Sequence, residues 1–299
     1  MTTKTLFAQG LLDGMPEAIT NLDDGSCDAL FSSRLLYYGE GCFDTFLVRE
    51  SHLYRPEEHL RRLRAGMELL ELDVPEGLSG EADFLNALAR LLQANKAEYE
   101  RVRVRIQVWA HDQTIGYQPA PGRRRARWLA TCVKVGDVLP VRLHTSRYRR
   151  VSDNAVPSHV KWSGAVNYVL AASEAGAAGA DDALMLSNEG YVSESTIANI
   201  FWLANGTVYT PDEQCDLLPG ITRQAVLHCL REMGVPVQTG RYNPGVLADA
   251  DMVWLCNSVR GIYPVEAIDH NVYAPGNLFW NRLLKVFEAH VRREERRVV

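Results

Sequence analysis

Hydrophobic residues recur every three or four positions in two segments of the first hundred residues. The first segment, residues 57–70, carries Leu60, Leu63, Met67 and Leu70 at this spacing. The second segment, residues 81–94, carries Phe84, Leu85, Leu88, Leu91 and Leu92. A period near 3.6 residues collects such side chains on one side of a helix. Both segments are therefore predicted to be amphipathic helices.

Two later segments alternate apolar and polar residues instead. These are residues 102–109, with the sequence VRVRIQVW, and residues 127–133, with the sequence RWLATCV. A period of two is typical of strands that have one apolar face. We therefore expect the first half of the chain to be a sheet with helices packed against it.

The second half shows signals for a hairpin and for two more helices. Asn205-Gly206 lies between residues 199–203 and 207–210, and this pair tolerates the positive φ angles of a type I′ turn. Residues 222–233, stopped by Gly234, and residues 277–295 have helical spacing. The last helix is expected to end in a frayed, charged tail.

A polar stretch rich in Arg and Ser, from about residue 145 to 158, precedes a change towards short strands. The length of 299 residues and the hydrophobic share of 46% allow one large domain or two medium ones. We expect two domains, residues 1–135 and residues 136–299.

Charge and cysteine usage narrow the class of protein. The formal net charge of −5 gives no reason to expect a nucleic-acid partner, and the arginine run at 123–127 is predicted to be a solvated loop entering a strand. Residues 1–10 lack the apolar core of a signal peptide, and no stretch approaches the ~20 apolar residues that cross a bilayer. The six cysteines show neither a C-x-x-C pair nor zinc spacing, so we expect reduced thiols and no metal site in a cytoplasmic protein.

Three short segments together suggest a specific chemistry. Lys161 supplies an amine, Glu194 a carboxylate, and Gly220-Ile221-Thr222 a helix start whose N–H groups can bind a phosphate. This set suits pyridoxal phosphate, because a lysine can condense with the cofactor aldehyde and a carboxylate can keep the pyridine nitrogen protonated. Each segment also has an ordinary interpretation: a surface lysine, a loop carboxylate and a plain helix start.

The order of these segments, with others around them, resembles the class IV aminotransferase family. The resemblance spans nearly the whole chain and rests on the motifs YGEGCFDT at 38–45, HLRRL at 59–63, SESTIANIF at 193–201, LPGITR at 218–223 and CNSVRGIYPV at 256–265. The family comprises the fold-type IV pyridoxal-phosphate enzymes. It implies an α+β fold of two domains, a small N-terminal α/β sandwich and a larger C-terminal pseudo-barrel that holds the cofactor and the catalytic lysine.

The resemblance also implies a role for each matching cofactor residue. Lys161 would bind the cofactor aldehyde as a Schiff base and then shuttle a proton, and Glu194 would hold the pyridine nitrogen. The phosphate would be bound by Arg62, Ile221, Thr222 and Ser258. No metal is implied.

Residues that match the substrate pocket of the family are Tyr38, Glu40, Phe43, Thr45, Tyr117, Asn257 and Arg260. The chain departs from the family at two points. Ile115 stands where many lyase relatives have Arg in an Arg-Gly-Tyr sequence, and Gly164-Ala165 stands where many relatives have Asn. Because Ile115 removes a positive charge that would anchor a carboxylate, Arg260 is a hypothetical replacement.

Three interpretations of the chemistry stay open. The motifs GEGCF at 39–43 and CNSVRGIYPV at 256–265 favour aminodeoxychorismate lyase, which releases pyruvate from 4-amino-4-deoxychorismate and leaves the folate precursor 4-aminobenzoate. The alternative enzyme is a transaminase of branched-chain or D-amino acids, and the third interpretation is a non-catalytic scaffold. The family implies a small-molecule amino substrate and a homodimer.

Overall fold

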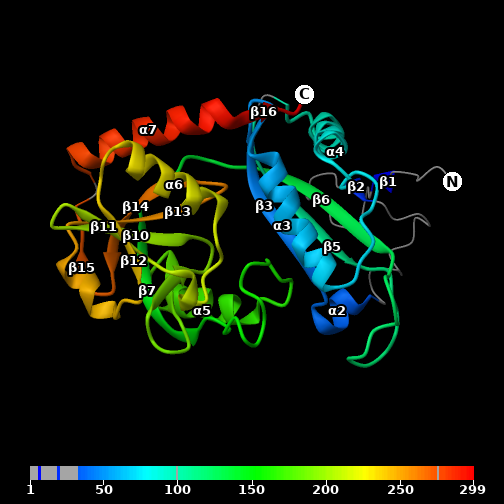
Figure 1. Ribbon diagram of the computed structural model, residues 1–299, viewed down its shortest axis with the longest axis horizontal. Helices are drawn as coiled ribbons and strands as arrows, with labels where there is room; N and C mark the ends of the chain where they lie inside the picture. The colour runs from blue at the N-terminus through cyan, green and yellow to red at the C-terminus, as the bar shows by residue number, and fades with distance from the viewer. Residues whose placement is uncertain (1–5, 8–18, 21–32, 99, 275) are drawn as a thin grey trace. The chain divides into compact units, whose positions relative to one another are not determined.

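The computed structural model describes residues 6–7, 19–20, 33–98, 100–274 and 276–299 (Figure 1). Cys27 and most of residues 1–10, from which the absence of a signal peptide is predicted, lie outside the described residues. The chain divides into two compact units. Unit 1 comprises Met1–Gly136, Val160–Gly164 and Glu294–Val299, and unit 2 comprises Asp137–His159 and Ala165–Arg293.

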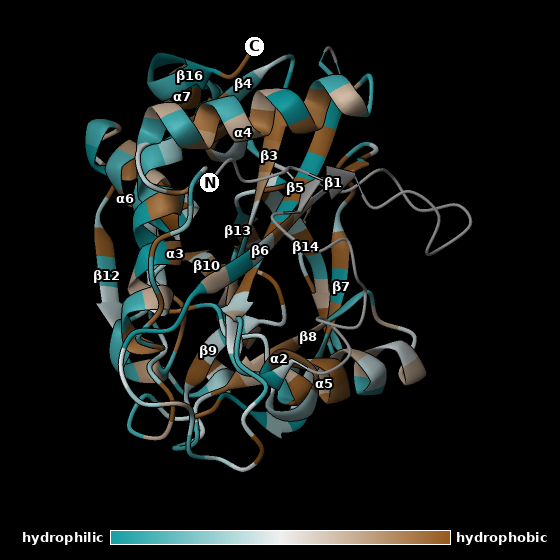
Figure 2. Ribbon diagram, turned by 90° about the vertical axis from the view of Figure 1, so that its right-hand side faces the viewer, coloured by the Kyte–Doolittle hydropathy of each residue, from teal (hydrophilic) through white to brown (hydrophobic). Residues whose placement is uncertain are grey.

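Unit 1 contains an antiparallel sheet in the order β1-β2-β6-β5-β3-β4-β16. Its strands are β1 (Leu6–Phe7), β2 (Ile19–Thr20), β3 (Gly41–Arg49), β4 (His52–Tyr54), β5 (Arg101–Ala110), β6 (Ala126–Lys134) and β16 (Glu295–Arg297). Along β3 and β5 the even-numbered residues are buried, and the alternation of apolar and polar residues along β5 can be followed in Figure 2. The sheet therefore has one apolar face, as the period of two predicts.

Helices cover that apolar face. These are α3 (Pro56–Leu69) and α4 (Glu81–Ala94), and the short α2 (Arg34–Tyr38) precedes β3. Pro56 at the first helical position and two glutamates in the first turn favour the start of α3. The buried side of α3 packs on β3, so that Leu63 and Met67 share one core with Phe46.

Unit 2 is built on a second sheet, in the order β12-β11-β10-β13-β14-β7-β8-β9. Its strands are β7 (Val141–Arg149), β8 (Asp182–Leu186), β9 (Val192–Ser195), β10 (Asn199–Ala204), β11 (Thr207–Pro211), β12 (Val237–Gly240), β13 (Met252–Asn257) and β14 (Gly261–Ile268), with β15 (Asn271–Val272) paired to β14. The last strand of this order, β9, also pairs with β10 through Glu194 and Asn199. That pairing closes the strands from β10 to β9 into a barrel.

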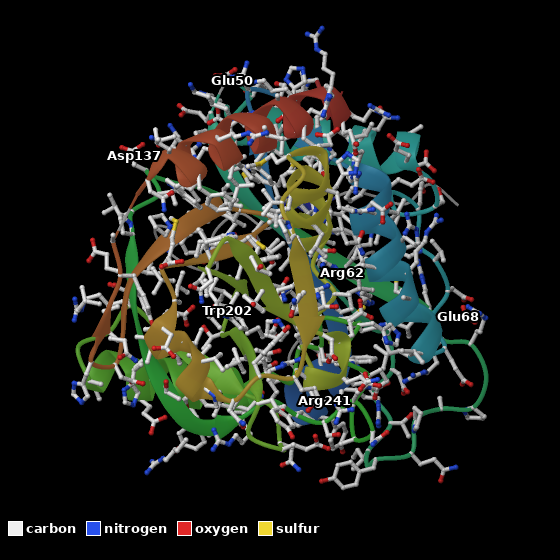
Figure 3. All side chains as sticks on the ribbon, turned by 60° about the vertical axis from the view of Figure 1, so that its left-hand side comes forward. Glu50, Arg62, Glu68, Asp137, Trp202 and Arg241 are labelled. Atoms are coloured by element: carbon white, nitrogen blue, oxygen red, sulfur yellow. The ribbon has the colours of Figure 1, made fainter. Side chains whose placement is uncertain are left out.

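The helices of unit 2 are α5 (Val166–Ala177), α6 (Ile221–Glu232) and α7 (Leu278–Glu294), with short 3-10 helices η1 (Glu213–Cys215) and η2 (Pro244–Asp249). Aromatic side chains fill part of the barrel core: Trp202 stacks on Tyr209 at 5.8 Å between ring centroids and meets Tyr242 edge-on at 5.0 Å. Trp202 is labelled in Figure 3. Within the described ranges no helix has the length and apolarity needed to cross a membrane.

Several predicted elements agree with the structure, and two features differ. The helix predicted at 81–94 is α4, and the predicted hairpin is β10 and β11, with positive φ angles at Asn205 and Gly206. The charged tail, however, is not frayed: Glu295–Arg297 pairs with β4, and Val298 is buried in the core of unit 1. The lysine segment, expected in the second domain, groups with unit 1.

Candidate functional site

The segment that carries Lys161 lies along the start of β3. Its backbone makes two hydrogen bonds of 2.9 Å, from Phe43 N–H to the Lys161 carbonyl and from Ser163 N–H to the Gly41 carbonyl. Cys42 and Trp162 form the antiparallel bridge between these bonds. The segment is thus held as a short extension of the sheet of unit 1, and the Lys161 Nζ atom lies 5.3 Å from the centre of the Phe43 ring.

Two glycines allow this close packing. A Cβ atom at Gly66 in α3 would lie 2.7 Å from Cys42 Cβ and 2.8 Å from Val160 Cγ1. A Cβ atom at Gly41 would lie 2.7 Å from the Val108 carbonyl oxygen. Real Cβ atoms do not approach other atoms so closely, so any larger residue would push the helix or the lysine segment away from β3.

Arg105 shares the Phe43 ring with Lys161, and the sequence did not single it out. Its guanidinium carbon lies 3.5 Å from the ring centre, a cation–π contact. Burial and the neighbouring Arg103 lower the pKa of Arg105, but an arginine side chain keeps its charge at neutral pH. The alternation of β5 could have indicated this residue, because Arg105 pairs with Thr45 on the face opposite the helices.

Arg62 lies on α3 and is labelled in Figure 3. Its guanidinium is bound by a carboxylate from β3: Nε donates to Asp44 Oδ2 at 3.0 Å, and Nη2 donates to Asp44 Oδ1 at 2.6 Å. The predicted phosphate ligand is therefore held in a fixed orientation by an acidic residue that was not predicted. Thr45, predicted to contact substrate, donates its backbone N–H to the same carboxylate at 2.6 Å.

Two of the predicted substrate residues, Tyr38 and Tyr117, meet at the loop after β5. Their rings are 5.6 Å apart, and the Tyr38 hydroxyl accepts the N–H of Gly116 at 2.7 Å. Buried Arg34 supports the loop by donating to the carbonyls of Thr114, Gly116 and Tyr117. At the loop tip Ile115 is 91% exposed and Tyr117 is 89% exposed.

Glu40, also predicted to line the pocket, is bound within unit 1 by two arginines. It pairs with Arg34 and, at 2.5 Å, with Arg124. Arg124 also lies 3.3 Å from Asp112, so the cluster holds charges of both signs. These contacts hold Glu40 beside the arginine that supports the loop, and its role in binding substrate stays a prediction.

In unit 2, four donors surround the carboxylate of Glu194. Oε1 accepts from Arg150 Nε at 3.2 Å and from the Tyr168 hydroxyl at 3.3 Å. Oε2 accepts from Asn199 Nδ2 and from the Leu218 N–H, both at 3.1 Å. A buried carboxylate with this many donors is stabilised in its ionised form. Glu194 is 5% exposed, so the exposed loop carboxylate that was the ordinary interpretation is not observed.

Asn199 connects Glu194 with the loop before α6. Its Nδ2 atom donates both to Glu194 and, at 2.9 Å, to the Leu218 carbonyl. A Cβ atom at Gly220 would lie 2.1 Å from Asn199 Oδ1. The glycine at the helix cap is therefore required by the amide packed against it. The sequence motif contained Asn199, but only the barrel pairing of Asn199 with Glu194 shows what it does.

The start of α6 has the features of an anion site. Gly220 caps the helix without any side chain that could accept its first N–H groups, and those groups have no partner within a helix. Ile221 and Thr222 occupy the first turn and are buried. The Thr222 Oγ1 atom lies 3.3 Å from Ser258 Oγ, so two of the predicted phosphate ligands meet here.

The remaining predicted residues, Asn257 and Arg260, belong to the turn between β13 and β14. Asn257 Oδ1 accepts the N–H groups of Val259 and Arg260, at 3.0 and 2.8 Å, and so forms the turn. The Arg260 guanidinium lies exposed over the Tyr263 ring at 5.2 Å. Burial raises the pKa of Tyr263 strongly, so its hydroxyl stays protonated.

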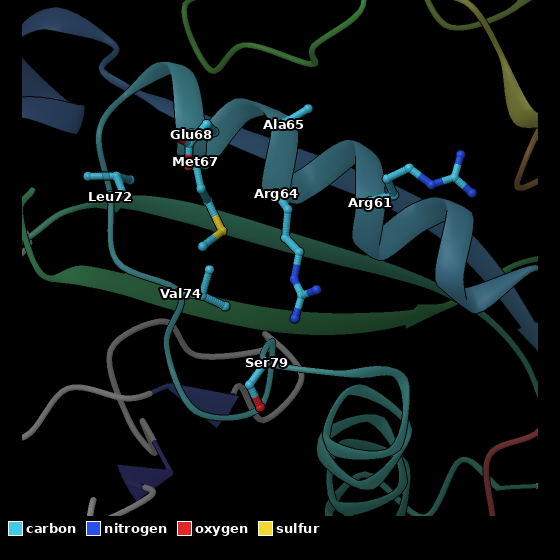
Figure 4. A pocket seen from close by; sticks show the side chains of 8 residues that line it. All are labelled: Arg61, Arg64, Ala65, Met67, Glu68, Leu72, Val74 and Ser79. Atoms are coloured by element: carbon cyan, nitrogen blue, oxygen red, sulfur yellow. The ribbon is translucent and has the colours of Figure 1, made fainter.

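A pocket on unit 1 contains none of these residues (Figure 4). Its volume is about 510 Å³, and it is lined by Arg61, Arg64, Ala65, Met67, Glu68, Leu72, Val74 and Ser79. Its two arginines have partners: Arg64 donates twice to the Leu78 carbonyl, and Arg61 pairs with Glu58. We therefore do not assign the chemistry to this pocket.

Comparison with known proteins identifies the class. The model of the family described as amino-transferase class IV matches residues 41–268, which is most of the chain. The protein therefore belongs to the class IV aminotransferase family, as the motifs predicted. The sheet-and-helix unit and the barrel unit are those of its fold-type IV enzymes, so the predicted α+β fold is confirmed.

Relatives with two different activities match over similar lengths. The aminodeoxychorismate lyase of Vibrio harveyi is 26% identical over 262 residues, which cover 86% of this chain and 90% of the relative. The branched-chain-amino-acid aminotransferase of Salmonella typhimurium is 26% identical over 250 residues, 79% of each chain. Among solved structures, the branched-chain amino acid aminotransferase of T.th. with pyridoxamine 5'-phosphate has a TM-score of 0.82 at 26% identity and covers 93% of this chain and 96% of its own.

Proposed function

We propose that this protein is a pyridoxal-phosphate enzyme whose reaction is that of an aminodeoxychorismate lyase. The cofactor is pyridoxal 5'-phosphate, as expected from the family and from the aminotransferase structure that contains its amino form. The observation that carries the proposal is the buried Glu194 carboxylate with its four donors, joined through Asn199 to a helix start that lacks a capping side chain. A pyridine nitrogen and a phosphate need these two features.

The residues present fit this cofactor. We propose that the Lys161 amine binds the aldehyde carbon and later moves a proton at the substrate carbon. Glu194 keeps the pyridine nitrogen protonated. The first-turn N–H groups of Ile221 and Thr222, with the Ser258 hydroxyl and Arg62, hold the phosphate. When bound, the cofactor supplies an electron-accepting ring, and the protein supplies position and charge.

The carboxylate anchor lost at Ile115 has a better candidate than Arg260. Arg105 and Lys161 both lie within 6 Å of the centre of one ring, that of Phe43. An amino substrate attached near Lys161 would therefore have a guanidinium within reach of its carboxylate. Arg260, by contrast, is exposed and lies over Tyr263. We propose Arg105 as the anchor.

The lyase is preferred because of the turn at 256–260. This chain has Cys-Asn-Ser-Val-Arg there, in which Asn257 forms the turn and Ser258 contacts Thr222. Transaminases of the family more often have Gly-Thr-Ala or Thr-Ser-Thr at this position. Similarity to branched-chain aminotransferases over the same length makes transamination the second candidate.

One set of assays separates the two reactions. Purified protein reconstituted with pyridoxal phosphate is given aminodeoxychorismate, and release of pyruvate and 4-aminobenzoate is measured. Amino transfer from leucine, D-alanine and L-glutamate to keto acids is measured in parallel. A rate of pyruvate release at least about tenfold above the fastest amino transfer supports the proposal. Amino transfer about tenfold faster than pyruvate release supports the transaminase. No turnover in either assay supports a scaffold.

Family membership also leads us to propose a homodimer. Light scattering of the purified protein tests this directly, since one chain has a mass of 33.5 kDa. A mass of one chain at micromolar concentration would contradict the proposal.

A further inference from the structure

Asp44 binds Arg62 from inside the core of unit 1, and nothing in the reaction itself requires a carboxylate there. We propose that Asp44 is a positioning residue that aims the Arg62 guanidinium at the cofactor phosphate, with His59 holding Asp44 in place. This inference rests on the proposed phosphate role of Arg62. It assigns a function to two residues, Asp44 and His59, that do not touch the cofactor.

The geometry of the pair fixes the plane of the guanidinium. Both oxygens of Asp44 are used, one by Nε at 3.0 Å and one by Nη2 at 2.6 Å. Two parallel hydrogen bonds of this kind orient a planar guanidinium, whereas a single bond leaves it free to rotate. Asp44 is itself rigid, because it lies on a central strand and accepts the Thr45 N–H at 2.6 Å.

The same geometry leaves donors free for an anion. A guanidinium has five N–H groups, and Asp44 accepts two of them. Within the described residues, the side-chain hydrogen bonds of Arg62 run from Nε and Nη2 to Asp44, and Nη1 takes no part in them. Nη1 and the second N–H of Nη2 form the outer edge of the fork. That edge suits two oxygens of a phosphate.

His59 completes the arrangement from one turn earlier in α3. Its Nδ1 atom lies 3.4 Å from Asp44 Oδ1, and its ring lies against Phe46 with 4.9 Å between centroids. Burial lowers the pKa of His59, so the ring is neutral and, with the proton on Nδ1, can donate to Asp44. Burial alone would raise the pKa of Asp44, but the charge and hydrogen bonds of Arg62 and His59 hold it well below its usual range.

A purely structural ion pair is the alternative interpretation. Both carboxylate and guanidinium lose solvation when buried, so such pairs contribute little net stability compared with apolar residues. The two interpretations differ in which ligands lose affinity when the pair is broken. A structural pair would affect all ligands through folding, whereas a positioning residue affects only ligands that carry the phosphate.

The test compares two ligands that differ in the phosphate alone. Pyridoxamine 5'-phosphate and pyridoxamine carry no aldehyde, so both bind without forming a bond to Lys161. Dissociation constants of the apoprotein are measured by fluorescence titration for the wild type, Asp44→Asn, Arg62→Gln and the double variant. Asp112→Asn is the matched control, because Asp112 is another carboxylate of unit 1 that contacts an arginine, Arg124 at 3.3 Å.

We expect Asp44→Asn to raise the dissociation constant of pyridoxamine 5'-phosphate about tenfold and that of pyridoxamine less than about twofold. Arg62→Gln should have the same selectivity with a larger effect. The double variant should be no weaker than Arg62→Gln alone, because Asp44 acts only through Arg62. Asp112→Asn should leave the ratio of the two constants unchanged.

The experiment distinguishes failure of the phosphate role of Arg62 from failure of the positioning role of Asp44. If Arg62→Gln leaves the ratio unchanged, the phosphate role of Arg62 is wrong. If Arg62→Gln changes the ratio but Asp44→Asn does not, or weakens both ligands equally, the positioning role of Asp44 is wrong. Should Asp44→Asn fail to fold, Asp44→Glu carries the same prediction, because it keeps the charge but moves the fork by one methylene.

Discussion

Glu194 accepts hydrogen bonds from a guanidinium, a phenol, an amide and a backbone N–H. We predict that Glu194→Gln lowers kcat by about 10²-fold or more, because the neutral amide no longer holds the pyridine nitrogen protonated. It also turns an NH₂ group towards donors, which should cost about 1–3 kcal/mol of unfolding free energy. Steady-state kinetics and urea unfolding measure the two effects.

The matched control is Glu189→Gln, which changes an exposed carboxylate that pairs with Arg241 at 3.2 Å on the surface. Its unfolding free energy should stay within about 0.5 kcal/mol of the wild type, and kcat should not change. Equal kinetic effects of the two substitutions would contradict the role of Glu194.

The lowered pKa of His59 makes the stability of the protein depend on pH. Burial lowers its pKa in the folded state, so the unfolded chain binds a proton at a higher pH than the folded one. Stability from this residue is present above the unfolded pKa of about 6.5 and is lost as the pH falls below it. We expect His59→Gln to make the decrease in unfolding free energy between about pH 6.5 and 5 shallower, by up to about 1.4 kcal/mol per pH unit.

The contribution of Asp44 to stability is also lost as the pH falls, but at lower pH than that of His59. Its pKa is depressed in the folded state, so its stability is lost only as the pH falls below about 4. Asp44→Asn should therefore leave the slope above pH 5 unchanged. Urea unfolding at a series of pH values checks both substitutions, and identical slopes in wild type and His59→Gln would refute the buried neutral histidine.

The proposed role of Arg105 as the carboxylate anchor is tested by measuring KM for the substrate. Replacing it with Met keeps much of the apolar stem but removes the charge, so we predict that KM for the substrate rises about tenfold or more while cofactor affinity is unchanged. Arg260→Met is the comparison and should change KM less than about twofold. If Arg260→Met raises KM and Arg105→Met does not, the carboxylate anchor is Arg260.

At this scale the sequence shows reactive groups but not the residues that hold them. Lys161, Glu194 and Thr222 could be proposed from the sequence because the chemistry expected of them is tied to residue type and order along the chain. Asp44 and Arg105 could not be proposed in this way, because their contacts depend on strand register and on the helix packed against the strand. Residues that contact a proposed site residue are recognised only in the folded chain.

Among the elements, α3 packs against β3 so closely that Gly66 has no room for a side chain. We predict that Gly66→Ala lowers the unfolding free energy by about 1–3 kcal/mol through overpacking against Cys42 and Val160. Because Val160 precedes Lys161, cofactor affinity should fall as well. Thermal or urea unfolding and a cofactor titration measure these effects.

A second helical glycine provides the control. A Cβ atom at Gly176 in α5 would have no neighbouring atom within 4 Å. Gly176→Ala should therefore stabilise the protein by up to about 1 kcal/mol, because alanine is the better helix former. If both substitutions change stability in the same direction, the close packing at Gly66 is not confirmed.

Local patterns predicted the helices well and the edges of the sheets less well. α4 agrees with its prediction because five apolar residues at helical spacing and a first turn with two acidic residues act in the same direction. β16 was missed because Glu295–Arg297 has no apolar alternation; its strand conformation comes from pairing with β4. Pairing between distant segments overrides local preference here.

For the whole molecule, the chain passes between the two units at four points, after Gly136, His159, Gly164 and Arg293. Linear boundaries such as 1–135 and 136–299 cannot describe such a chain. Five residues that follow a segment of unit 2 return to the sheet of unit 1 and bring Lys161 with them. The position of Lys161, the proposed catalytic lysine, is therefore a property of the complete fold.

The central claim is that the Lys161 amine forms the covalent bond to the cofactor. Protein reconstituted with pyridoxal phosphate is treated with borohydride, digested and analysed by mass spectrometry, with Lys134→Ala and Lys161→Ala treated in parallel; Lys134 is a surface lysine paired with Glu100. We predict that the phosphopyridoxyl group is found on the peptide containing Lys161, that Lys134→Ala is labelled equally and that Lys161→Ala is unlabelled. A label on another lysine of the wild type, or none, would contradict the account.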